Sequence, residues 1–122
     1  MKLELKHLAP YLPYDISITD GKYNYKMTLG ISTKDISVRN VIRSEGRYKP
    51  ILRPLYDIFT DDYLDYLTWG SLSEYRKLIK SEALLININY QDYIYLIANH
   101  FDVFGLIDAG LAIDINTLNK QV

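Results

Sequence analysis

The fold of this chain is decided by residues 99–116, which read NHFDVFGLIDAGLAIDIN and hold its densest apolar pattern. Apolar residues at spacings of three and four begin upstream, at Tyr90, and continue into this stretch. That spacing predicts an amphipathic helix beginning near Tyr90. The apolar stripe formed by these residues continues past Gly105, which we interpret as a close-packing or bend position. Gly110 stands at the position where a glycine commonly ends a helix.

Beyond that glycine the hydrophobic period changes to two. Leu111, Ile113 and Ile115 alternate with smaller or polar residues, which predicts a strand that returns to the sheet, and Thr117–Val122 reads as a polar tail. On the predicted helix His100 falls on the buried stripe, and the acids of the stretch fall on the polar face. The stretch is therefore expected to build the core.

The N-terminal half contains two alternating runs joined by an Asp-Gly step at residues 20–21. Ile16 and Ile18 alternate with polar residues before this step, and Tyr23–Leu29 alternates after it. Such a pattern is a strong signal for a β-hairpin. A third run, Ile36–Ile42, is rich in β-branched residues and is expected to complete an antiparallel meander.

Prolines shape the connecting segments. Leu5 and Leu8 could share one face of a single helical turn, and the next two prolines favour an extended N-terminal arm laid on the core. Pro50 and Pro54 each remove a backbone donor. We therefore expect residues 48–56 to form an extended edge or crossover segment and not a central strand.

Two short helices are predicted in the second half of the chain. One is capped at Thr60 or Asp61 and ends at Gly70, and the other runs from about Leu72 to Ser81 behind a capping box. The segment Ala83–Asn89 fits either a strand or a helix.

Together these patterns predict one α+β domain over residues 1–122. In it a small antiparallel sheet, made of the N-terminal meander and the C-terminal strand, packs against two or three helices. The chain has no cysteine, which excludes disulfides, thiolate zinc sites and cysteine nucleophiles. Neither a signal peptide nor a run of about 20 apolar residues is present. We expect a soluble, cytoplasmic protein that does not act at a membrane.

No residue pattern points to catalysis. The chain has neither a phosphate-binding glycine loop nor a G-x-S-x-G motif. His100 could gather around a metal with Asp102, Asp108 and Asp114, but on a helix Asp102 would point away from it. A hydrogen-bonded, half-buried histidine is the favoured interpretation.

Asp61, Asp62 and Asp65 could supply paired carboxylates for acid–base catalysis, but helix caps and a solvated helix face explain them better. We therefore assign no catalytic, cofactor-binding or metal-ligating residue and expect no cofactor. Whether the chain is an enzyme is left open, with a non-enzyme favoured. A hydrolase built on these acids or on His100 stays an alternative hypothesis.

The net charge of −1 conceals an uneven distribution. Residues 1–56 hold ten Lys/Arg and five Asp/Glu, a net of +5, whereas residues 57–122 hold four and ten, a net of −6. The two halves could simply attract each other, or the basic half could bind nucleic acid and the acidic half a partner.

The chain also holds 12 tyrosines against three Phe and one Trp. Tyrosine suits the margin of a core, and it is also enriched at interfaces. Tyrosines flanked by cations are used by binders of single-stranded nucleic acid, whereas a solvated sheet face is the simpler explanation. The candidate surface for a partner or nucleic acid comprises Tyr23, Tyr25, Arg39, Arg43, Arg47, Tyr48, Lys49 and Arg53.

Three blocks resemble those of a small uncharacterised family found in phages, prophages and mobile elements of gut anaerobic bacteria. They are HLAPYLPY at 7–14, KPILRPL at 49–55, and HFDVFGLI at 100–107 followed by GLAIDINTL at 110–118. They span most of the chain, and one departure is Tyr56, where a small polar residue is expected. The resemblance implies a mobile-element context and offers no catalytic residues.

The resulting hypothesis is a phage- or prophage-type accessory protein that acts without catalysis by binding another macromolecule. A protein partner or a second copy of the chain is favoured. The alternative is binding of single-stranded nucleic acid through the basic, tyrosine-bearing half.

Overall fold

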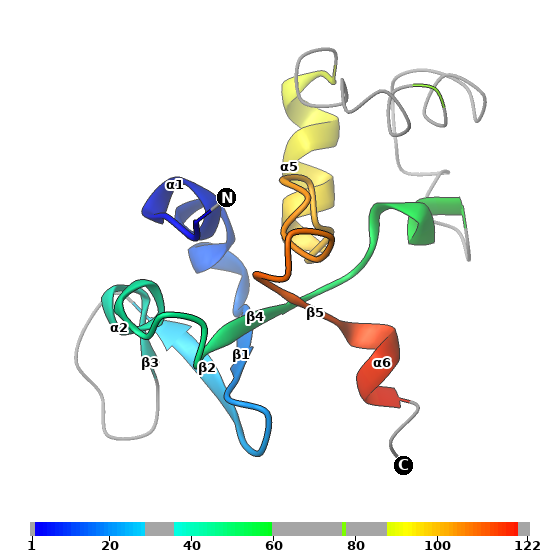
Figure 1. Ribbon diagram of the computed structural model, residues 1–122. Coiled ribbons are helices and arrows are strands. Elements are labelled where there is room, and N and C mark those ends of the chain that lie inside the picture. Colours follow the sequence, from blue (N-terminus) through cyan, green and yellow to red (C-terminus); the bar gives the residue numbers. More distant parts are fainter. Residues whose placement is uncertain (1, 29–35, 60–76, 78–87, 120–122) are drawn as a thin grey trace.

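The computed structural model describes residues 2–28, 36–59, 77 and 88–119. Its helices and strands follow one another as α1 (Leu5–Leu8), the 3-10 helix η1 (Ala9–Tyr14), β1 (Ser17–Thr19), β2 (Asn24–Thr28), β3 (Ile36–Ser37), α2 (Val38–Arg43), β4 (Lys49–Leu52), the 3-10 helix η2 (Leu55–Phe59), α5 (Tyr90–Ala98), β5 (Ile113–Asp114) and α6 (Ile115–Asn119). The five strands form one sheet in the order β3-β2-β1-β4-β5 (Figure 1). The predicted α+β class is confirmed, but the sheet is mixed, because β3 and β5 lie parallel to their neighbours.

The predicted hairpin is confirmed. β1 and β2 pair antiparallel, with Thr19 opposite Asn24. The Asp20 carboxylate closes the turn by accepting the backbone N–H of Lys22 at 2.9 Å and that of Tyr23 at 2.7 Å. Gly21 has a φ of 93°, which glycine adopts without steric cost.

The prediction of a third antiparallel strand at Ile36–Ile42 is wrong, both in the direction of the strand and in most of its length. Only Ile36 and Ser37 form a strand, and it is parallel to β2. Ser37 then caps a helix, because its hydroxyl accepts the Asn40 N–H at 3.2 Å. In that helix, α2, Val38 and Val41 lie three residues apart and are both buried, so apolar residues that suggested a strand form a helical face.

The segment with two prolines is extended as predicted but is not an edge. β4 pairs with β1 through Lys49 and Pro50 and with β5 through Ile51 and Leu52. Each half of β4 therefore pairs on one side only. Pro50 lies in the half that pairs with β1, so no hydrogen bond to β5 requires the backbone N–H that proline lacks. Pro54 then accepts the Asp57 N–H at 3.0 Å as η2 begins.

The single helical turn expected at Leu5 and Leu8 is confirmed as α1, but the extended path expected after it is wrong. α1 passes directly into η1, whose proline φ values suit a 3-10 helix, and Asp15 ends it at a φ of 54°. Tyr11 of η1 has no exposed surface. This segment is thus part of the core.

The helix predicted through Gly105 ends much earlier. α5 begins at Tyr90 behind the Asn89 cap, as predicted, and stops at Ala98. His100 takes a left-handed φ of 65°, and the N–H of Phe101 donates to the Leu96 carbonyl at 2.9 Å, which is the hydrogen-bond pattern of a helix C-terminus.

A separate turn follows α5. The Asp102 carboxylate caps it by accepting the N–H groups of Leu106 and Ile107, both at 2.8 Å. Gly105 and Gly110 have φ values of 74° and 77°, so Gly110 does end a turn as a C-cap glycine would, whereas Gly105 is not inside a helix. Asp102 is buried, which corrects its placement on a polar helix face.

The C-terminal strand is confirmed but short. Only Ile113 and Asp114 belong to β5, and α6 replaces the start of the predicted polar tail. Of the helices predicted within residues 60–81 the structure describes only Lys77, and residues 83–87 of the ambiguous segment Ala83–Asn89 also lie outside the described residues. Among the described residues, no helix has the length and apolar character needed to cross a membrane.

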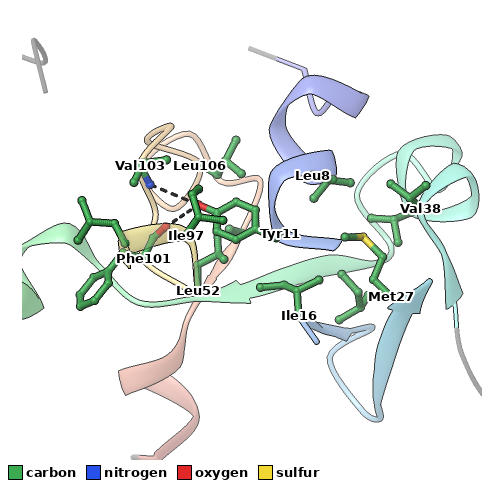
Figure 2. Packing of buried hydrophobic residues seen from close by; sticks show 14 of the residues in the cluster. Leu8, Tyr11, Ile16, Met27, Val38, Leu52, Ile97, Phe101, Val103 and Leu106 are labelled. Carbon is green, nitrogen blue, oxygen red and sulfur yellow. Dashed lines mark hydrogen bonds between the residues drawn. The ribbon is translucent and has the colours of Figure 1, made fainter. Parts of the chain in front are cut away.

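The core joins the N-terminal segment, one face of the sheet, α5 and the turn after it. Figure 2 shows Tyr11 of η1 beside Ile97, Phe101 and Val103, with Leu52 of β4 below them. Residues of β1, β2 and α2 extend this cluster toward Met27 and Val38. The buried residues of the cluster are Leu8, Tyr11, Ile16, Ile18, Met27, Val38, Val41, Leu52, Ile58, Leu96, Ile97, Phe101, Val103, Leu106 and Ala112.

Candidate functional site

Two of the predicted surface tyrosines meet across the sheet. Ile18 lies opposite Tyr25 on one side and opposite Pro50 on the other. Because side chains alternate along a strand, Tyr48 falls on the same face as Pro50 and hence as Tyr25. The two rings pack edge to face, with 6.0 Å between their centroids and an interplanar angle of 83°.

Cations lie over two of the tyrosine rings. The Arg47 guanidinium is 5.4 Å from the centroid of the Tyr48 ring, and the Lys22 ammonium is 5.3 Å from that of Tyr23. Ser44 fixes the loop that carries Arg47, because its carbonyl accepts the Arg47 N–H at 3.2 Å and its hydroxyl accepts the Tyr48 N–H at 3.1 Å.

Asp20 connects the turn to the tyrosines. Its second carboxylate oxygen accepts the Tyr25 hydroxyl at 3.4 Å. Hydrogen bonds from the N–H groups of Tyr23 and Lys22 hold the pKa of Asp20 below its usual value. Partial desolvation, followed by the charge of Asp20, raises the pKa of Tyr25. We call Lys22, Tyr23, Tyr25, Arg47 and Tyr48 the tyrosine–cation cluster.

Arg39 and Arg43 are exposed on α2, and Arg43 belongs to its last turn, just before the loop of Arg47. Among the described residues, Arg39, Arg43 and Arg47 form no ion pair.

Two other predicted surface residues, Lys49 and Arg53, lie away from the cluster. Lys49 lies opposite Thr19, on the face of the sheet away from Tyr48. Arg53 lies at the other end of β4, where its N–H donates to the His100 carbonyl and its carbonyl accepts the Asp102 N–H, both at 2.8 Å. Arg53 thus joins β4 to the end of α5.

Sequence reasoning missed Asp20 as a residue of this site, and it noted Lys22 only within the run of residues 22–26 near the predicted basic surface. The Asp-Gly step marks the turn, but nothing in the sequence says that the second carboxylate oxygen of Asp20 would reach the hydroxyl of Tyr25, five residues further along the chain. A turn aspartate next to alternating tyrosines is the only signal available in advance.

The histidine considered as a ligand or catalyst has a structural partner. The Nε2 atom of His100 hydrogen-bonds the Tyr14 carbonyl. Both oxygens of Asp102 accept backbone N–H groups, and burial raises the pKa of this carboxyl. In the described ranges, no three His, Asp or Glu side chains gather as a metal site would require. Asp61, Asp62 and Asp65 lie outside those ranges.

Comparisons with known proteins supply no family for this chain. No family model, no curated protein and no solved structure matches it.

Proposed function

We propose that this chain is a non-enzymatic accessory protein, of the phage or prophage type that its sequence resembles, and that it binds another protein. Its binding surface is the tyrosine–cation cluster together with Arg39 and Arg43. The partner surface is acidic.

The observation that carries this proposal is the exposure of Tyr23 beside the Lys22 ammonium, with Arg47 over the Tyr48 ring of the same cluster. Tyr23 is 57% exposed at the hairpin turn, although it is a large aromatic residue. Tyrosine and arginine are enriched in protein interfaces and in the residues that dominate binding energy. Arg43 and Arg47, which form no ion pair among the described residues, add the positive charge that favours an acidic partner.

The contacts that the Tyr25 and Tyr48 rings already make favour a protein partner over single-stranded nucleic acid. Bases stack on open aromatic faces. Arg47 lies over Tyr48, and Tyr25 is half-buried with its ring packed against Tyr48. Stacking on these two rings would have to break contacts that the fold already makes, which leaves Tyr23 as the exposed ring.

A photo-crosslinking experiment tests the proposal. A photoreactive phenylalanine analogue replaces Tyr23, and in a matched control it replaces Tyr90, which is 78% exposed at the start of α5. Each protein is irradiated in a lysate of cells that naturally produce the chain. We expect a crosslinked protein from position 23 alone, and we expect Arg47→Glu to remove it while leaving the melting temperature unchanged.

Two results would contradict the proposal. One is the same crosslinked products from both positions, or none from position 23. The other is salt-sensitive binding of a labelled single-stranded oligonucleotide that Arg47→Glu abolishes, which would make nucleic acid the ligand.

A further inference from the structure

We infer that the outer edge of β2, at Asn24–Lys26, receives an extended acidic segment of the partner protein as an additional strand of the sheet. This inference rests on the proposed function and specifies how the partner is held.

The hairpin register fixes which backbone groups of β2 point outward. The Asp20 N–H donates to the Tyr23 carbonyl, and the Met27 N–H donates to the Ile16 carbonyl, each at 3.2 Å. Hydrogen-bonded pairs alternate along an antiparallel ladder. Tyr25 therefore directs its backbone groups toward β1, and Asn24 and Lys26 direct theirs away from it.

β3 covers only the far end of this edge. It pairs with Met27 and Thr28, and no other described residue pairs with β2 on that side. Asn24 and Lys26 are exposed, and the parallel pairing of Met27 with Ile36 engages the carbonyl of Lys26 but neither its N–H nor the backbone of Asn24. The N–H and carbonyl of Asn24 and the N–H of Lys26 are thus presented to a new strand, which is the arrangement used in β-strand addition.

The side chains along this edge define the pattern of the incoming segment. Lys26 projects from one face of the sheet, and Tyr25 projects from the other. Residues directly opposite each other in neighbouring strands have Cβ atoms about 4.5–5.5 Å apart, so a carboxylate placed near Lys26 meets its charge. The favoured segment alternates acidic residues with apolar ones that pack beside Tyr25 and Tyr23.

The same charges disfavour a second copy at this edge. Two β2 edges paired with each other would bring Lys22 and Lys26 of both copies together, and lysines on an edge are a common protection against such pairing. An acidic segment is instead attracted by these lysines.

The probe is a fluorescein-labelled peptide of alternating glutamate and valine with blocked ends. Its binding is followed by fluorescence anisotropy and by the amide NMR shifts of the protein. We expect saturable binding, with the largest shifts at the N–H groups of Asn24 and Lys26.

N-methylated versions of the peptide test the strand geometry. One version is methylated on every glutamate nitrogen and the other on every valine nitrogen. An added strand directs alternate N–H groups to β2, so only one version is expected to lose binding, by at least about tenfold. The version that loses binding also reports whether the added strand is antiparallel or parallel.

A pair of charge variants tests the site on the protein. Lys26→Glu is expected to weaken peptide binding by at least about tenfold, whereas Lys6→Glu makes the same change in net charge on α1 and is expected to have little effect. The Lys6 side chain is 73% exposed and, among the described residues, pairs only with the exposed Glu4, and Lys26 is exposed as well, so neither variant disturbs the core.

Several results would overturn the inference. These are no saturable binding, equal affinity for both N-methylated peptides, equal effects of the two charge variants, or a concentration-dependent dimer that the peptide dissociates. If the crosslink from position 23 persists while the peptide results fail, the protein-binding function stands and strand addition is wrong. If that crosslink is absent, the proposed function itself has failed.

Discussion

Tyr11 shows how one hydroxyl can connect distant parts of a chain. Its ring is fully buried, its hydroxyl donates to the Phe101 carbonyl, and it accepts the Val103 N–H at 3.4 Å. Burial raises the pKa of this hydroxyl far above its usual value, so it stays protonated and able to donate. A phenylalanine would fill the same space but leave both backbone groups without this partner.

We therefore predict that Tyr11→Phe lowers the free energy of unfolding by about 0.5–1.5 kcal/mol, the usual net contribution of a hydrogen bond, because the Val103 N–H still donates to the Phe101 carbonyl at 3.0 Å. Chemical denaturation measures this loss. Tyr90→Phe is the control, because Tyr90 is exposed and is expected to have no effect. A Tyr11→Phe loss no larger than that of the control would contradict the assigned role of the hydroxyl.

His7 makes stability depend on pH. Its Nδ1 atom accepts the Glu4 N–H at 3.0 Å, and its ring packs edge-on against Phe104 at 5.7 Å between centroids. Desolvation, with a smaller contribution from Lys6, lowers the pKa of His7 below the ordinary 6.5. The neutral ring is thus the form that the folded state prefers.

The lowered pKa of His7 determines how stability changes with pH. Stabilisation by neutral His7 is complete above pH 6.5 and is lost as pH falls from 6.5 through the lowered pKa, because the unfolded chain takes up the proton first. We predict that the melting temperature of the native protein falls between about pH 7 and about pH 5, and that His7→Gln removes most of this fall. Parallel slopes for both proteins would contradict the role given to His7.

At the scale of elements, the predictable parts are those whose signal lies within a few neighbouring residues. The Asp-Gly turn between alternating runs indicated the β1–β2 hairpin, and the Asn89 cap with its apolar spacing indicated the start of α5. The tyrosines of the candidate site were identified by type. Alternation placed Tyr25 on the second strand of the hairpin, and Tyr48 was expected in the extended segment 48–56; it lies just before β4.

The rest depends on neighbours that are distant in sequence. β3 and β5 have two residues each and are strands because β2 and β4 pair with them. Ile36–Ile42 could form a strand or a helix by its own pattern, and the Ser37 cap decides for the helix. The end of α5 was missed because a histidine, and not a glycine, takes the left-handed position, with its ring held by the Tyr14 carbonyl.

Gly105 distinguishes the predicted helix from the observed turn. Inside a helix, Gly105→Ala would stabilise the protein by about 0.5–1 kcal/mol. At a φ of 74°, with nothing within 4 Å of a new Cβ, the same change costs about 1–2 kcal/mol of backbone strain. We expect Gly105→Ala to lower the free energy of unfolding and Gly105→Asn to lower it less. A stabilised Gly105→Ala variant would favour the helix.

At the scale of the whole molecule, the N-terminal segment formed by α1 and η1 supplies part of the core. Leu8 and Tyr11 have no exposed surface, and Tyr14 holds His100. Removing the burial of two such side chains costs several kcal/mol, which is comparable with the total stability of a domain.

We predict that a chain lacking residues 1–14 shows no cooperative thermal transition by circular dichroism. A synthetic peptide of these residues, added in excess, is expected to restore the transition, whereas the peptide with Tyr11→Ala is not. Cooperative melting of the truncated chain alone would show that the N-terminal segment is dispensable.

The link between Tyr11 and Phe101 also has a consequence during synthesis of the protein. The two residues are separated by 90 positions, so the first helical turns leave the ribosome long before their partners do. Until then, Leu8 and Tyr11 present apolar surface that the nascent chain cannot yet cover. Contacts of such long range form slowly and leave intermediates prone to aggregation. This chain is thus expected to complete its core only after Phe101 has left the ribosome.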